Sequence, residues 1–182
     1  MRSVFALAGA FLTAALSAPS FAQDVRGARD FADLPRVEGA HVRAWRQLAV
    51  AEITLPTGPV AEGSAPDKAV RLQGQISHTD YVIRPAISPL DIDRHYEEAL
   101  RSAGYETVFA CTGISRCGAG MGALILLGDA VSPPGFADGV FNDQLRVTVA
   151  RKGATWVLLH MTRGPDRSLV YQAVVEGARD VD

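Results

Sequence analysis

Strong net charge is absent from this sequence, which has 18 Lys and Arg residues against 20 Asp and Glu residues and a formal net charge of −2. Proteins that bind nucleic acid or lie on anionic membranes need a concentrated positive surface to attract phosphate groups. The sequence therefore argues against both classes. Beyond the N-terminus it also lacks an apolar run of about 20 residues, the length that a membrane-spanning helix needs. The chain of 182 residues is long enough for one globular domain, and its 17 Gly and 10 Pro residues indicate many turns.

The start of the chain has the pattern of a cleavable export signal. Arg2 supplies a positive charge, residues 4–16 are apolar and uncharged, and the small residues that signal peptidase requires come just before Gln23. We therefore expect a signal peptide over 1–22 and a single exported domain over 23–182. No cysteine lies near the cleavage site, which argues against a lipoprotein. An uncleaved N-terminal membrane anchor is the alternative interpretation.

Cysteine is scarce, since Cys111 and Cys117 are the only two in the chain. In an exported protein, two cysteines this close together favour a disulfide, because the compartment is oxidising. The loop is short, so closing it contributes only about 2 kcal/mol in the chain-entropy model, and the bond would fix a local loop. A metal site would need ligands beyond two thiolates, and a redox-active pair more often has the spacing Cys-x-x-Cys. Both of these alternatives stay open.

The hydrophobic pattern predicts several strands and one long amphipathic helix. Strands are expected over residues 41–55 (as one strand or two), 70–77 with 81–83, 105–110, 145–150, 156–161 and 169–175. Residues 118–127 fit a helix and a buried strand equally well. Short turns separate the last three strands, which predicts an antiparallel meander. We therefore expect an α+β domain, an antiparallel β-sheet with one main helix packed on a face.

The helix is expected over residues 89–103, where both ends carry clear signals. Ser88 can act as the N-cap, Pro89 fits the first helical position, and Asp91 can reach back to the cap. Gly104 ends the helix. Between these ends one apolar stripe recurs at helical spacing, formed by Ile92, Tyr96, Ala99, Leu100 and Ala103.

A series of short motifs follows in order along the chain after residue 22. They are Asp24-Val25 with Gly27, Leu34-Pro35-Arg36, Glu38-Gly39, Gly74, residues 81–85, residues 88–91, Tyr96-Glu97, Ala103-Gly104-Tyr105, Cys111, Cys117-Gly118 and residues 174–176. In this order they resemble the DUF4892 family of Gram-negative envelope proteins. The resemblance implies a periplasmic location and carries no established reaction. His95 departs from the family, which usually has Asn there. An OmpA-like peptidoglycan-binding domain follows in many members, but the resemblance does not extend to such a domain here, so it does not imply peptidoglycan anchoring.

One pair of residues has catalytic chemistry at a suggestive spacing. His78 and Asp80 lie two residues apart in an expected strand and therefore on the same face of it. An imidazole and a carboxylate so placed form a metal pair or the base and orienting acid of a triad. The simpler interpretation is that the two side chains only make one face of the strand polar. The sequence has no Gly-x-Ser-x-Gly motif and no further ligand close by, so we assign no catalytic and no metal residue.

Two other sequence features are weaker indications of a binding site. Gly118, Gly120 and Ala123 fit the dinucleotide pattern G-x-G-x-x-(G/A), but that mechanism needs a strand directly before it and a helix after it. A cysteine loop precedes it here, so we expect a close-packed turn and no cofactor. Trp45 and Trp156 are either sugar-stacking platforms or aromatic residues of the sheet.

The sequence thus predicts a small periplasmic protein that acts by binding rather than by catalysis. The expected partner is an outer-membrane protein or a cell-wall component, with no nucleic acid. The alternative function is an envelope hydrolase that uses His78 and Asp80. The site residues that we name are the disulfide pair, Cys111 and Cys117.

Overall fold

The computed structural model describes residues 23–63, 65–127, 130–136 and 144–181. The expected signal peptide over 1–22 lies outside the described residues. In chain order the elements are β1 (Ala40–Pro56), β2 (Ala69–Ile83), α1 (Pro89–Ser102), β3 (Glu106–Thr112), α2 (Gly113–Cys117), α3 (Met121–Leu126), β4 (Arg146–Lys152), β5 (Thr155–Arg163) and β6 (Ser168–Asp180). The expected α+β class is confirmed.

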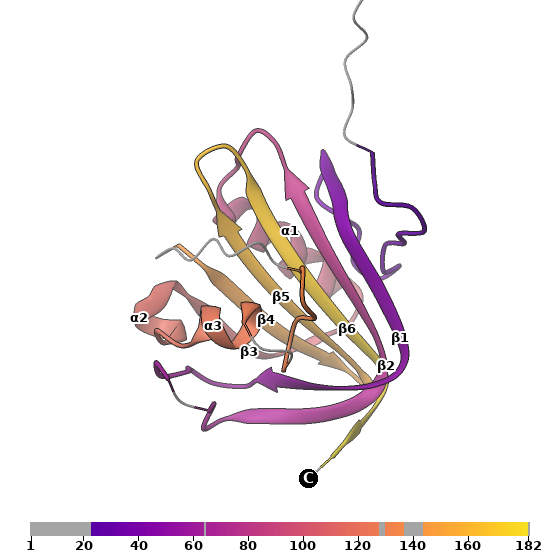
Figure 1. Cartoon of the computed structure of the whole chain (residues 1–182), viewed down its shortest axis with the longest axis vertical. Coiled ribbons are helices and arrows are strands. Elements are labelled where there is room, and N and C mark those ends of the chain that lie inside the picture. The colour runs from indigo at the N-terminus through magenta and orange to yellow at the C-terminus, as the bar shows by residue number, and fades with distance from the viewer. Residues whose placement is uncertain (1–22, 64, 128–129, 137–143, 182) are drawn as a thin grey trace, which may run out of the picture.

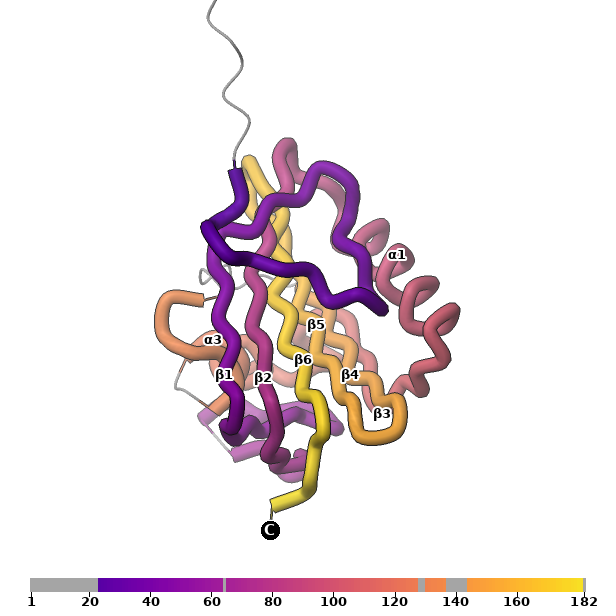
Figure 2. Tube along the Cα trace, turned by 90° about the vertical axis from the view of Figure 1, so that its right-hand side faces the viewer, coloured from indigo at the N-terminus to yellow at the C-terminus, as the bar shows by residue number. Residues whose placement is uncertain are grey.

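The strands form one six-stranded sheet in the order β1-β2-β6-β5-β4-β3, and all neighbouring strands are antiparallel. The meander β4-β5-β6 and the single long strand β1 agree with the sequence pattern. After β2 the chain crosses one face of the sheet through α1 and returns as β3 at the far edge (Figure 1). Figure 2 shows α1 on one side of the sheet and α3 on the other.

Both faces of the sheet are therefore buried over its centre. We call the side that α1 covers the α1 face and the opposite side the α3 face. The α1 face is built around Tyr81, Ile92, Tyr96, Leu100, Val157, Leu159, Met161, Val170 and Val174. The α3 face is built around Ile76, Cys111, Cys117, Met121, Ile125, Val147, Val149, Leu158, Tyr171 and Ala173. Burial on both faces explains the nearly continuous apolar runs of β5 and β6.

Helix α1 begins and ends as its sequence predicts. The Ser88 side chain accepts a hydrogen bond from the amide of Leu90 at 3.2 Å, and Gly104 follows the helix with φ of +80°, a conformation that glycine adopts without steric cost. Of the apolar stripe, Ile92, Tyr96 and Leu100 are buried, and Ala99 and Ala103 are partly buried against the same core. Residues 118–127, which fitted two states, contain the short helix α3.

The segment before β1 is packed on the α1 face rather than extended into solvent. Leu34 is completely buried there. Arg36 forms ion pairs with Asp24 at 2.7 Å and with Asp30 at 2.8 Å, and the Tyr81 hydroxyl donates a hydrogen bond to Asp30 at 3.0 Å. These contacts fasten the N-terminal segment to β2.

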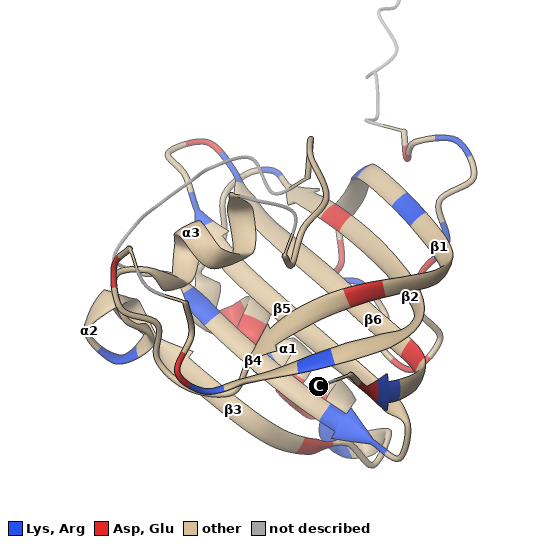
Figure 3. Cartoon of the chain, turned by 60° about the horizontal axis from the view of Figure 1, so that its bottom comes forward, with Lys and Arg blue, Asp and Glu red and all other residues tan. Residues whose placement is uncertain are grey.

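The surface carries both signs of charge side by side. Figure 3 shows Lys and Arg residues interspersed with Asp and Glu residues over the strands. Between β1 and β2, Arg71 lies 2.6 Å from Glu52, and between β2 and β6, Gln75 donates to Glu176 at 3.1 Å. In the described part of the chain no helix combines the length and hydropathy that a membrane span requires.

Candidate functional site

Strand β2 places His78 and Asp80 on the α3 face, but both are buried. Their exposed fractions are 4% and 0%, so the polar strand face that they form is covered by other parts of the chain. The physical reason is that the segment 130–136 packs over this part of the sheet. Phe136 contacts the His78 ring edge-on, with the centroids 5.9 Å apart. A strand pattern alone cannot show what a distant segment covers.

His78 and Asp80 have different hydrogen-bond partners. The Nδ1 atom of His78 lies 2.7 Å from the Tyr171 hydroxyl, and that hydroxyl donates to the Val131 carbonyl at 3.0 Å. The Asp80 carboxylate forms an ion pair with Arg43 at 2.6 Å. In a triad the carboxylate would accept the Nδ1 proton of the histidine. Here a tyrosine takes that place, and the carboxylate neutralises an arginine.

The environment keeps His78 neutral. Burial, together with a smaller effect of the nearby Arg46 guanidinium, lowers the pKa of His78 from 6.5 to about 4. Because the Tyr171 hydroxyl uses its only proton on Val131, the hydrogen-bond network assigns the imidazole proton to Nδ1. The result is a chain of hydrogen bonds from β2 through β6 to the segment 130–136.

The same chain holds the segment 130–136 against the sheet. Val131 is fixed by Tyr171, and Phe136 packs between His78 and Arg46, whose guanidinium carbon lies 5.9 Å from the ring centroid. Aromatic and cation–π contacts of this kind add about 0.5–1.5 kcal/mol each to simple burial. The cluster therefore serves packing and segment placement.

The other histidines do not complete a catalytic or metal site. His160 is opposite Tyr171 in the β5–β6 register, and burial lowers its pKa to about 4. His95 lies across the sheet, where its Nε2 atom is 2.7 Å from the Pro35 carbonyl oxygen, and His41 lies near the start of β1. Among the described residues, no three His, Cys, Asp or Glu side chains come together as metal ligands.

The two cysteines are joined in a disulfide, as the sequence predicts. Cys111 lies near the end of β3 and Cys117 ends α2, so the bond closes the single turn of helix between them. Cys117 is completely buried and Cys111 is 8% exposed. The bond fixes the end of edge strand β3 to the α3 face.

The glycine-rich motif after the disulfide makes a close backbone contact. The Val60 amide donates to the Cys117 carbonyl and the Gly120 amide donates to the Val60 carbonyl, each at 2.9 Å. A Cβ atom on Gly118 would lie 2.1 Å from the Val60 oxygen, and one on Gly120 would lie 2.1 Å from the Ala61 oxygen. The motif is thus a packing site for the β1–β2 loop, in agreement with the expected close-packed turn.

Removing the disulfide should lower the free energy of unfolding by about 2 kcal/mol, because the reduced chain gains conformational freedom in its unfolded state. We expect this loss in urea unfolding with dithiothreitol and in the double variant Cys111→Ser/Cys117→Ser. Tryptophan fluorescence can report the transition. Dithiothreitol added to the double variant is the matched control and should change nothing. Equal stability with and without reductant would contradict a structural role for the bond.

The two tryptophans and the acidic residue Asp93 contact other parts of the fold. Trp156 is 9% exposed and the Arg151 guanidinium carbon lies 5.5 Å from its ring centroid, so little of the ring is open to a stacking sugar. Trp45 packs against the α1 face. Asp93 of α1 pairs with Arg146 of β4 at 2.5 Å and links the helix to the sheet.

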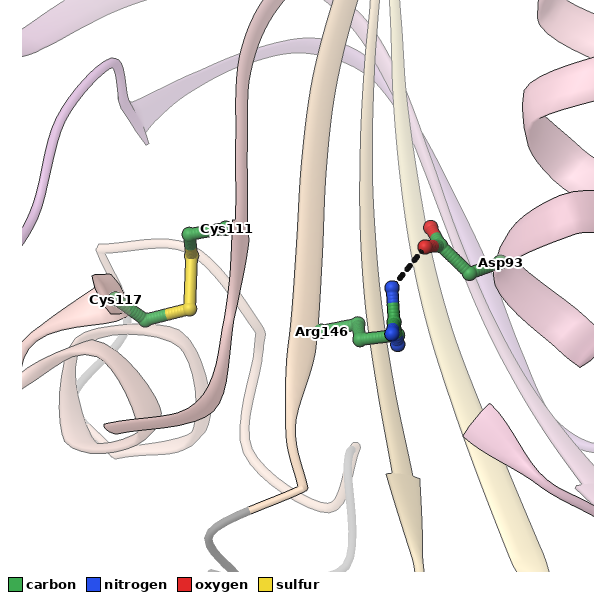
Figure 4. Close-up of a disulfide and its surroundings, with 4 residues drawn as sticks. All are labelled: Asp93, Cys111, Cys117 and Arg146. Atoms are coloured by element: carbon green, nitrogen blue, oxygen red, sulfur yellow. Dashed lines mark hydrogen bonds and ion pairs between the residues drawn. A yellow bond between two sulfur atoms is a disulfide. The ribbon is translucent and has the colours of Figure 1, made fainter. Parts of the chain in front are cut away.

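A surface cavity lies beside that ion pair. It has a volume of about 340 Å³ and is lined by Ser88, Pro89, Leu90, Thr112, Gln144 and Arg146. Figure 4 shows Arg146 reaching toward Asp93 on the α1 face, while the disulfide lies on the other side of β3. Sequence reasoning missed this cavity because its walls come from three separate segments that only the sheet register brings together.

Comparisons of the chain with protein-family models and with curated proteins found no match. The resemblance to DUF4892 therefore stays a prediction from the motifs.

Proposed function

We propose that this chain is an exported protein of the periplasm that binds a component of the cell wall or outer membrane and catalyses no reaction. The signal-peptide pattern, the DUF4892-like motifs and the disulfide, which suits an oxidising compartment, support the location.

One observation carries the non-catalytic part of the proposal. His78 and Asp80, the residues with the chemistry of a hydrolase, are both buried and are bound to Tyr171 and Arg43. A general base must reach the proton that it abstracts from a substrate or water. With these partners, the two side chains stabilise the α3 face instead. Recognition then falls to the surface of the domain.

The test is co-sedimentation of the exported protein, residues 23–182, with isolated sacculi and separately with outer-membrane vesicles. Each mixture is compared with and without dithiothreitol. We expect the protein to pellet with one of the two, and to pellet less after reduction if the loop at Cys111 and Cys117 supports the contact. Failure to pellet with either would overturn the proposal. Time-dependent release of soluble fragments from either would instead favour the hydrolase, and His78→Gln should then abolish the release.

A further inference from the structure

The cavity beside α1 has the dimensions of a small-molecule subsite. Its volume of about 340 Å³ lies at the lower end of the range of about 300–1,000 Å³ that ligand pockets occupy. Three elements supply its walls: the first residues of α1, the end of β3 and the start of β4. Two of these walls are linked, since the Asp93–Arg146 ion pair joins α1 to β4.

The cavity is not built for an anion. Pro89 has no amide proton, the Leu90 amide donates to the Ser88 hydroxyl, and the amides of Asp91 and Ile92 donate to the Ser88 carbonyl at 3.0 and 3.3 Å. The first turn of α1 thus has no amide left to offer to a phosphate or carboxylate. The positive charge of Arg146 is balanced by Asp93.

The polar groups that remain suit hydroxyl groups. The ion pair uses one nitrogen of the Arg146 guanidinium, Nη1, and the guanidinium has five N–H donors in total. Thr112 is exposed, and its hydroxyl makes no capping hydrogen bond to α2. Donors and acceptors are therefore mixed, with no net charge.

One wall of the cavity is apolar. Pro89 and Leu90 form it, and Leu90 is 37% exposed, although the outward side of α1 is otherwise polar. An apolar wall opposite mixed donors and acceptors matches a sugar ring, which has C–H groups on its faces and hydroxyl groups around its edge.

We propose that this cavity binds one ring of an uncharged saccharide. This inference rests on the proposed function and narrows it, since it makes a glycan of the envelope the binding partner. The disulfide supports the site from the opposite face of β3, because Cys111 is the residue next to Thr112 in the chain (Figure 4).

The test is an amide NMR titration of residues 23–182 with the fully N-acetylated form of chitotriose, a soluble uncharged saccharide, and separately with inorganic phosphate. We expect saturable shifts centred on Leu90 and Thr112 with chitotriose, an affinity that salt does not change, and no competition by phosphate. Absence of saturable shifts would overturn the proposal, and so would displacement of chitotriose by phosphate, which would indicate an anion site.

Two pairs of variants give the matched controls. Thr112→Val should weaken chitotriose binding about fivefold, the effect of one lost hydrogen bond, whereas Thr107→Val changes an exposed threonine of the same strand away from the cavity and should not. Leu90→Ala should weaken binding, whereas Val108→Ala, at 39% exposure, should not. Equal effects within either pair would contradict the assignment.

The result is separable from that of the proposed function. If the protein pellets with sacculi or vesicles, and Thr112→Val pellets equally well and no chitotriose shifts appear, only the saccharide inference fails. If the protein pellets with neither, the proposed function fails.

Discussion

Lowering the pH from 7 to 4 should remove about 3 kcal/mol of unfolding free energy for each of His78 and His160. Burial lowers the pKa of each imidazole from its ordinary value of 6.5 to about 4. Between these two values the unfolded chain binds protons that the folded chain does not, so protonation favours unfolding. The stabilising contribution is complete above pH 6.5 and is lost as the pH falls toward 4. Small domains have only about 5–15 kcal/mol of stability, so the loss is large.

The expected loss has a structural consequence at the α3 face. A proton on His78 would place a second positive charge beside Arg46, which already packs on Phe136. His160 would become charged opposite Tyr171, in the centre of the sheet. Both events weaken the packing that holds the segment 130–136, so we expect this segment to open before the rest of the domain.

Urea unfolding at a series of pH values measures the loss, and NMR titration of the four histidines assigns it. His160→Gln should reduce the slope of stability against pH between 4 and 6.5. His41→Gln is the matched control, since it removes a partly exposed histidine, and it should keep the slope. If His78 and His160 titrate near 6.5, or if stability is the same at pH 7 and pH 4.5, the burial argument is wrong.

The elements that the sequence predicts best are those whose signals are local. Helix α1 has its cap, its apolar stripe and its terminal glycine within 17 residues of chain, 88–104, and the structure reproduces it. Strand β6 runs to Asp180, beyond the expected end at 175, because its pairing with β2 extends there. Pairing partners come from a distant part of the chain, so strand ends are less predictable than helix ends.

In the candidate site, too, local features could be predicted from the sequence and contacts with distant segments could not. The count and spacing of the cysteines predicted the disulfide, and the spacing of His78 and Asp80 predicted their shared face. Their burial was not predictable, because the segment that covers them is about 50 residues away in the sequence. Tyr171 was missed for a related reason: it meets His78 only through the register between β2 and β6.

Replacing Gly120 with Ala should lower the free energy of unfolding by about 3 kcal/mol. The backbone of Gly120 has φ of −82° and ψ of −13°, which any residue can adopt, so the loss comes from space alone. The new Cβ atom would lie 2.1 Å from the Ala61 oxygen, and relieving that contact means moving the β1–β2 loop. The hydrogen bond from the Gly120 amide to Val60 would then break, leaving buried polar groups without partners, at about 1–3 kcal/mol each.

Gly118→Ala should cost at least as much, because Gly118 combines a blocked Cβ position with φ of +86°. Gly27→Ala separates these two causes: its φ is +84° but it has open space around it, so only the backbone strain of about 1–2 kcal/mol applies. Ala119→Ser changes the exposed residue between the two glycines and should be nearly neutral. Urea unfolding followed by tryptophan fluorescence ranks the four variants. If Gly120→Ala is as stable as Ala119→Ser, the β1–β2 loop can move without a loss of stability. The close contact at Gly120 would then not stabilise the fold.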